Sequence, residues 1–156
     1  EYDVLGPWYK CNMTDIQAAL GLVQLKRYQG MLDRRKELIS LYDSYLTPLG
    51  VEPLPHYGDD YASSGHLYIC RVPHISPEQR NEIIEAMAER GVATNVHYKP
   101  LPMMTAYKDL GFDIADYPNA YARFANEITL PLHTRLTDEE ARYVASSLAE
   151  IVEGMR

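Results

Sequence analysis

The sequence contains the segment YKCNMTDIQAALG, Tyr9 to Gly21, in which polar and aromatic residues directly precede the start of a long helix. Thr14 is followed three residues later by Gln17, which matches a capping box in which the two side chains satisfy free backbone N–H groups. Apolar residues then recur at helical spacing, at Ile16, Ala19, Leu20, Val23, Tyr28, Met31 and Leu32. The sequence therefore predicts a helix that begins at Thr14.

The helical pattern continues well beyond this segment. It resumes with apolar residues at Leu38, Leu41, Tyr42 and Tyr45. Pro48 and Gly50 mark its end, so one helix of about thirty residues, or two helices broken near Gly30, would reach ~45 Å. Small side chains at positions 18, 19 and 21 suit either the close approach of another backbone or ordinary core packing.

Four extended segments are expected downstream of the long helix. Residues 51–55 predict a short edge strand, because their prolines lack the backbone N–H that would bond to a neighbouring strand. HLYICRV, residues 66–72, predicts a buried strand, and VATNVHY, residues 92–98, alternates in polarity and predicts another. EITLPL, residues 127–132, predicts the last strand, and residues 56–65 are expected to form a polar loop.

Two further capping boxes predict helices among these strands. The box at Ser76 is followed by Pro77 at the first helical position, and Gly91 ends that helix. The box at Thr137 opens the last helix. The buried stripe of this last helix is expected at Ala141, Val144, Ala145, Leu148, Ile151 and Val152. Shorter helical segments are expected near residues 103–110 and 119–126.

This order of elements indicates an α/β fold with the character of a small α+β domain. We expect a long N-terminal helix and a small sheet of three to four strands covered by helices. At 156 residues the chain is long enough to bury one core and too short for two ordinary domains.

Composition excludes several classes of function. The formal charge of −7 would repel a phosphate backbone, so nucleic acid is not an expected partner. No apolar run approaches the roughly 18 residues of a membrane span and no signal peptide is evident, so we expect no membrane contact and a cytoplasmic location. Cys11 and Cys70 lack metal-ligand spacing and are expected to be free thiols, and no metal site is expected.

Two polar clusters lie at the ends of the expected elements. Lys10 and Asn12 precede the capped helix and point the same way in an extended chain, so they either grip an anion near the positive helix end or hydrate a loop. Asn95, His97 and Lys99 share one face of the segment 92–98 and its continuation. His97 could donate to a substrate oxygen or exchange a proton near neutral pH, or it could be purely structural.

Six segments in order resemble the C-terminal part of the DegT-like sugar-nucleotide aminotransferases. They are YKCNMTDIQAALGLVQLKR, HLYICRV, RGVATNVHYKPLP, YKDLG, YPNAYARFANEITLPLH and LTDEEARYV, and together they cover nearly all of the chain. The family has aminotransferase fold type I, uses pyridoxal phosphate and works as homodimers. The resemblance implies that residues 1–156 are the C-terminal small domain and that a large cofactor-binding domain precedes Glu1.

The resemblance also assigns expected roles to individual residues. Asn12, or Lys10 in a variant of the family motif, would contact the cofactor phosphate of the neighbouring subunit, and His97 would bind substrate near the entrance. The second histidine of the family pattern is replaced by Pro102, and the usual aromatic residue by Cys11. The lysine that binds the cofactor covalently belongs to the large domain, so no catalytic residue is expected in this chain, which alone should be inactive and should not bind the cofactor.

The function implied by the resemblance is transfer of an amino group from an amino acid, with glutamate the usual donor, to a keto-sugar nucleotide. Products of this kind serve cell-surface polysaccharides or secondary metabolites. Two alternatives stay open at this point. One is a dehydratase of the same family, and the other is a non-catalytic dimerisation or regulatory module.

Overall fold

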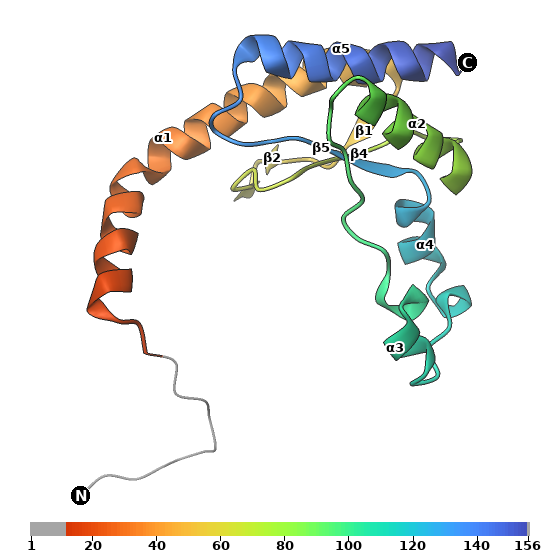
Figure 1. Ribbon diagram of the computed structural model, residues 1–156, viewed down its shortest axis with the longest axis horizontal. Coiled ribbons are helices and arrows are strands. Elements are labelled where there is room, and N and C mark those ends of the chain that lie inside the picture. The colour runs from red at the N-terminus through yellow and green to blue at the C-terminus, as the bar shows by residue number, and fades with distance from the viewer. Residues whose placement is uncertain (1–11, 156) are drawn as a thin grey trace, which may run out of the picture.

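The computed structural model describes residues 12–155, and its long first helix begins where the sequence predicts (Figure 1). Helix α1 (Asp15–Leu46) is one continuous helix of 32 residues, without a break at Gly30. Thr14 Oγ1 accepts from the Gln17 backbone N–H at 3.3 Å, and Gln17 Oε1 accepts from the Thr14 backbone N–H at 3.0 Å. The predicted capping box is therefore confirmed.

The remaining elements are a single helical turn, four short strands, a run of helical segments, a fifth strand and a last helix. In chain order they are η1 (Thr47–Leu49), β1 (Glu52–Pro53), β2 (Tyr57–Gly58), β3 (Tyr61–Ala62), β4 (Tyr68–Arg71), α2 (Pro77–Glu89), η2 (Leu101–Met103), α3 (Thr105–Lys108), η3 (Ile114–Asp116), α4 (Pro118–Phe124), β5 (Glu127–Leu130) and α5 (Asp138–Gly154). The capping boxes of α2 and α5 are both formed as predicted. The expected polar loop 56–65 differs from the prediction, because it contains the short hairpin β2–β3.

Three antiparallel strands in the order β1, β4, β5 form the main sheet, and β1 is its predicted edge strand. In the β4–β5 pair, Tyr68 lies opposite Leu130 and Arg71 lies opposite Glu127. Because side chains alternate between the faces of a strand, Tyr68 and Cys70 share one face while Ile69 and Arg71 share the other. The sheet therefore has a core face and a second face that is available for a site.

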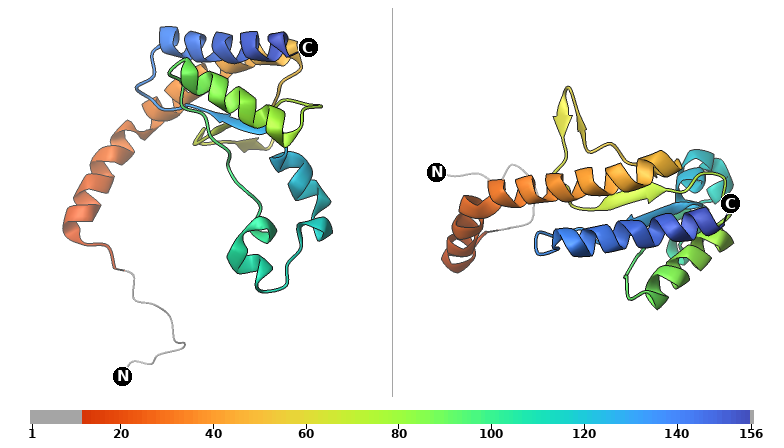
Figure 2. Two further views of the ribbon diagram at one scale, coloured as in Figure 1. Left: turned by 45° about the vertical axis from the view of Figure 1, so that its right-hand side comes forward. Right: turned by 90° about the horizontal axis from the view of Figure 1, so that it is seen from above.

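Helices cover the core face of the sheet. Seen from above, α5 lies between α1 and α2, and the second half of α1 runs beside α5 (Figure 2). The largest fully buried side chains of this core are Tyr42, Tyr68, Leu38, Ile39, Leu46, Ile83, Met87, Ile128, Leu130 and Leu148. These residues are shielded by the chain's own elements, so the chain closes a core by itself.

Two tyrosines connect α1 to the sheet at the centre of this core. The rings of Tyr42 and Tyr68 meet edge to face with centroids 4.8 Å apart. The Tyr42 hydroxyl donates to the Pro131 carbonyl at 2.7 Å, and the Tyr68 hydroxyl donates to Asp43 Oδ1 at 2.8 Å. Burial raises the pKa of both phenols, so they act as neutral hydrogen-bond donors.

Cys70 faces this core as a free, fully buried thiol, as the sequence predicts. Its Sγ lies 3.5 Å from the Ile128 carbonyl oxygen, and burial raises the pKa of the thiol. Cys11 lies outside the described residues.

The prediction of a strand over Val92–Tyr98 is wrong. Only Asn95 forms a bridge in this segment, exchanging both backbone hydrogen bonds with Thr129 at 2.8 and 3.2 Å. The backbone N–H of His97 turns instead to the side chain of Glu127. Alternating polarity had indicated a strand, but a side chain replaces the partner backbone that a strand would need.

The first half of α1 is exposed, although its apolar residues have the predicted helical spacing. It projects away from the sheet in Figure 1, and Ile16, Leu20 and Leu25 are 76%, 64% and 68% exposed. The buried part of the helix begins only at Leu38. Among the described residues, the helices all lack the combination of length and apolar character that crossing a bilayer requires.

The capping boxes at the two ends of the chain provide a matched test of this architecture. Thr137→Ala should lower the free energy of unfolding by about 1 kcal/mol, because α5 is buried in the core from Ala141 to Val152. Thr14→Ala should lower the free energy of unfolding by less than half as much, since the first turns of α1 can unravel without opening the core. Urea unfolding followed by circular dichroism checks both, and equal shifts would contradict the independence of the first half of α1.

His56 provides a second test because it is partly buried next to the hairpin. Its Nδ1 lies 3.1 Å from Ser63 Oγ, while its buried Nε2 has no hydrogen-bond partner among the described residues. Burial lowers the pKa of His56, and the nearby Asp43 carboxylate opposes this with a smaller effect. Protonation would place a charge where only a neutral ring is well accommodated.

The stability that neutral His56 contributes should therefore depend on pH. Because its pKa is lower in the folded state than the unfolded value of about 6.5, the unfolded state takes up the proton first as pH falls. This stability is complete above the unfolded pKa and is lost as pH falls toward the folded pKa. His56→Gln should flatten the decline of unfolding free energy between about pH 7.5 and about pH 5.5 in urea titrations. Parallel curves for the two proteins would refute this assignment.

Candidate functional site

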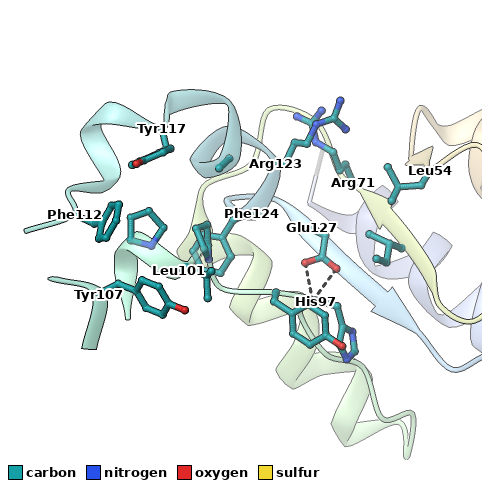
Figure 3. Close-up of a pocket in the computed structure, with 15 residues that line it drawn as sticks. Leu54, Arg71, His97, Leu101, Tyr107, Phe112, Tyr117, Arg123, Phe124 and Glu127 are labelled. Atoms are coloured by element: carbon teal, nitrogen blue, oxygen red, sulfur yellow. Dashed lines mark hydrogen bonds between the residues drawn. The ribbon is translucent and has the colours of Figure 1, made fainter. Parts of the chain in front are cut away.

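A pocket of about 570 Å³ lies between the sheet and the segment that carries α3 and α4 (Figure 3). Its walls are largely apolar, and five aromatic side chains contribute to them, Tyr98, Tyr107, Phe112, Tyr117 and Phe124. Tyr98 follows the Asn95 bridge, Tyr107 lies in α3 and Phe112 lies between α3 and η3, while Tyr117 directly precedes α4 and Phe124 is its last residue. Flat apolar walls of this kind suit a planar or ring-shaped ligand.

Four residues that can carry charge line the same pocket. Arg71 and Glu127 come from opposed positions of β4 and β5, and Arg123 comes from α4. Arg71 Nε donates to Asn126 Oδ1 at 2.9 Å. The guanidinium of Arg123 makes neither a hydrogen bond nor an ion pair with any described residue, so its charge is available to an anion. His97 is the fourth residue.

Arg80 holds the backbone at the junction between α4 and β5. The pocket residue Glu127 is the first residue of β5. Arg80 is only 4% exposed, and one of its terminal nitrogens donates to the carbonyl oxygens of Phe124 and Glu127 at 3.1 and 3.3 Å. Its guanidinium also lies over the Phe124 ring, 5.0 Å from the centroid. Burial lowers the pKa of Arg80, and the Glu127 carboxylate opposes that shift. Arg80 thus fixes the backbone that positions Glu127.

Glu127, Thr129 and His97 form a hydrogen-bonded network at the edge of the pocket. Glu127 is 5% exposed, and its carboxylate accepts the His97 backbone N–H at 3.0 and 3.2 Å to its two oxygens (Figure 3). Thr129 Oγ1 lies 2.7 Å from Glu127 Oε1 and 2.9 Å from His97 Nδ1. The His97 ring also meets the Tyr98 ring edge to face, with centroids 4.7 Å apart. Backbone and ring of His97 are therefore both fixed.

The structure separates the residues that the sequence singled out as site candidates. His97 lines the pocket, whereas Asn12 is exposed ahead of α1 and does not belong to the pocket lining. Lys10 lies outside the described residues. Asn95 turns its side chain back to the Val96 backbone N–H at 2.8 Å, and Lys99 is exposed and does not line the pocket. Within residues 12–155, no cluster of three or more side chains could hold a metal ion.

Sequence reasoning missed Glu127 and Thr129, which the structure places beside His97. A signal was present, because strand alternation puts positions 127 and 129 on the same face of EITL, opposite the apolar Ile128 and Leu130. An acidic residue on an otherwise buried strand is unusual enough to suggest a site. Arg71 follows from the same argument applied to β4.

Comparisons with known proteins agree with this fold. Residues 2–149 match the model of the DegT/DnrJ/EryC1/StrS aminotransferase family. The spore coat polysaccharide biosynthesis protein SpsC of Bacillus subtilis is 35% identical over 156 residues, which cover 98% of this chain and 40% of SpsC. Helicobacter pylori PseC, an aminotransferase involved in the biosynthesis of pseudoaminic acid, is 29% identical with a TM-score of 0.82, over 99% of this chain and 43% of PseC.

Spr1654 of Streptococcus pneumoniae, whose structures were solved as those of a proposed sugar aminotransferase, is more similar still. Its apo form is 55% identical with a TM-score of 0.91, over 99% of this chain and 39% of Spr1654, and structures of its PMP and PLP forms match similarly. The chain thus spans about 40% of the length of these relatives. With a family match over nearly its whole length, the chain belongs to the DegT/DnrJ/EryC1/StrS aminotransferase family.

Proposed function

We propose that this chain is the C-terminal small domain of a pyridoxal-phosphate-dependent aminotransferase that passes an amino group from an amino acid to a keto-sugar nucleotide. Glutamate is the expected donor, and a polysaccharide or secondary-metabolite sugar is the expected use of the product. The observation that carries the proposal is the pocket around His97, found in a chain that overlays Spr1654 with a TM-score of 0.91 over 99% of its length. The relatives SpsC and PseC support the sugar assignment by their own named roles.

The chemistry of the pocket supports binding of a nucleotide sugar. Aromatic walls such as Tyr107 and Phe112 can stack against a flat ring, while Arg71 and Arg123 supply positive charge for phosphate groups. His97 stands at the polar end of this pocket beside Glu127 and can hydrogen-bond the ligand there. In this proposal the pocket contributes substrate recognition rather than the reaction itself.

The described residues fit the cofactor only as contributors to a larger site. Asn12 offers an exposed amide just ahead of the capped N-terminus of α1, where an anionic phosphate is favourably placed. The described lysines Lys26, Lys36, Lys99 and Lys108 are all exposed, and none lines the pocket. We therefore propose that Asn12, with Lys10, completes a phosphate site whose covalent lysine lies in a preceding large domain. When bound, the cofactor supplies the electron sink for amino-group exchange.

The exposed half of α1 supports the proposal that the active enzyme is a homodimer with a second, larger domain. Its apolar side chains, among them Ile16, Leu20 and Leu25, lie uncovered along several turns. Contiguous exposed apolar surface of this kind marks an interaction site. The large domain and the neighbouring subunit are the partners we propose for it, and Asn12 at the tip of this helix would reach the neighbour's cofactor.

Two alternatives remain for the complete protein: a sugar dehydratase of the same family and a non-catalytic dimerisation module. The full-length protein should release 2-oxoglutarate from glutamate when a keto-sugar nucleotide is supplied. Loss of water from the sugar without amino transfer would favour the dehydratase. A start codon directly upstream of this chain, together with neither reaction, would favour the module.

The isolated chain should not form a covalent link with pyridoxal phosphate at any one lysine. The described lysines are exposed and lie outside the pocket, without the enclosed surroundings in which a lysine forms a stable imine with a cofactor. Absorbance spectra of the chain mixed with the cofactor, followed by borohydride reduction and peptide mapping, check this. A stoichiometric adduct at one specific lysine would show that the chain contains a complete site.

His97→Ala in the full-length enzyme should raise KM for the sugar nucleotide about tenfold, which corresponds to one lost hydrogen bond. It should leave KM for the amino donor nearly unchanged, because the donor carries no nucleotide to reach this pocket. Steady-state kinetics with each substrate varied in turn separate the two effects. His66→Ala, which changes an exposed histidine outside the pocket, is the matched control. Equal KM values for His97→Ala and the wild type would refute the substrate contact.

A further inference from the structure

The network beside the pocket determines which nitrogen of His97 carries the proton. Thr129 Oγ1 lies between Glu127 Oε1 at 2.7 Å and His97 Nδ1 at 2.9 Å. A threonine hydroxyl has a single proton, and a carboxylate can only accept. Two oxygens at 2.7 Å repel each other unless a proton lies between them, so the hydroxyl proton points to Glu127.

The direction of the second hydrogen bond follows from the first. Since Thr129 has donated its proton to Glu127, its oxygen can only accept from His97. Nδ1 of His97 must therefore carry a proton. In the neutral imidazole only one nitrogen is protonated, so Nε2 then presents a lone pair. No described residue bonds to this Nε2.

The rest of the surroundings keeps this arrangement in place. The second oxygen of the Glu127 carboxylate is engaged by the His97 backbone N–H at 3.0 Å, which prevents the carboxylate from turning away. Thr129 is itself only 5% exposed, and its backbone is paired with Asn95 on one side and with β4 on the other. Water therefore has little access to compete for the hydroxyl.

We infer that Glu127 and Thr129 are positioning residues that hold neutral His97 as its Nδ1–H tautomer, so that Nε2 accepts a hydrogen bond from an N–H or O–H donor of the substrate. The substrate part of this inference rests on the proposed function, whereas the tautomer follows from the network alone. With this tautomer, neutral His97 accepts a hydrogen bond from the substrate through Nε2, whereas the sequence had suggested that it donates to a substrate oxygen. A ligand that places only hydrogen-bond acceptors next to Nε2 should bind less well, because two acceptors cannot form a hydrogen bond.

Replacing Glu127 by glutamine provides the sharpest test, because the change is isosteric. The glutamine oxygen must stay with the His97 backbone N–H, so its NH₂ group turns to Thr129. Thr129 then accepts from glutamine, and because its buried hydroxyl has no other described acceptor, its proton goes to Nδ1, which moves the imidazole proton to Nε2. Glu127→Gln should therefore invert the tautomer, whereas Thr129→Ser retains the hydroxyl and should preserve it.

The tautomer can be observed directly in the 156-residue chain labelled with ¹⁵N-histidine. Two-bond ¹H–¹⁵N correlation spectra at about pH 8.5, where an ordinary imidazole is neutral, distinguish a protonated Nδ1 from a protonated Nε2. His97→Ala assigns the signal, and backbone amide spectra verify the fold of each variant. An Nε2–H signal in the wild type, or an unchanged signal in Glu127→Gln, would overturn the inference.

Kinetics of the full-length enzyme then separate this inference from the proposed function. Glu127→Gln should raise KM for the sugar nucleotide about tenfold with a smaller change in kcat, and Thr129→Ser should stay near the wild type. If His97→Ala raises KM but Glu127→Gln does not, the positioning role is refuted while the substrate contact stands. If neither variant alters KM, the substrate contact itself is refuted, and with it the role of Nε2 as an acceptor for substrate.

Discussion

The antiparallel pairing of β4 with β5 is the constraint that organises both the core and the pocket. Its register places Tyr68 opposite Leu130 on the helix side and Arg71 opposite Glu127 on the other side. A slip of one residue would move every side chain of the slipped strand to the wrong face. It would bury a carboxylate or a guanidinium among the apolar residues of the helix layer, at a cost of several kcal/mol. The same register therefore keeps charged side chains out of the core and places Arg71 and Glu127 at the pocket.

Features governed by neighbours in the sequence could be predicted, and those governed by distant contacts could not. The caps at Thr14, Ser76 and Thr137 depend on a partner three residues away, so their sequence patterns were sufficient. The segment 92–98 was misread because alternation indicates two environments without showing that a partner strand exists. Its fate depends on Glu127, which is 30 residues away from His97.

The candidate site shows the same division. His97 was identified from the sequence as a polar residue in a recognisable segment, but the atoms that orient it belong to β5. Glu127 and Thr129 looked like ordinary members of a strand, because the pattern EITL contains nothing that names their partner. The aromatic walls come from residues that scatter over a long, largely exposed segment with little regular structure. Only the folded arrangement brings Tyr98, Tyr107 and Phe124 around one space.

Helix α1 shows why periodicity alone cannot tell whether a helix face is covered. Its two halves carry similar apolar spacing, yet Leu38 and Ile39 are buried while Ile16 and Leu20 are exposed. Burying a large aliphatic side chain is favourable by about 1.5–3 kcal/mol. Covering the several exposed side chains of α1 with another surface would therefore release a substantial free energy. A chain that spans about 40% of the length of its relatives leaves room for such a surface elsewhere.

The buried carboxylate of Glu127 is difficult to explain by stability alone. No described cation lies within ion-pair distance of it, and a buried charge without a close counter-ion is costly even when it is hydrogen-bonded. A hydroxyl or amide in its place could both donate and accept, so the hydrogen bonds through Thr129 could run in either direction. A carboxylate accepts only, and this property gives the network a single direction that ends at His97. The charge is therefore best understood as fixing the polarity of a hydrogen-bond chain, with the backbone carbonyls held by Arg80 keeping its starting point in place.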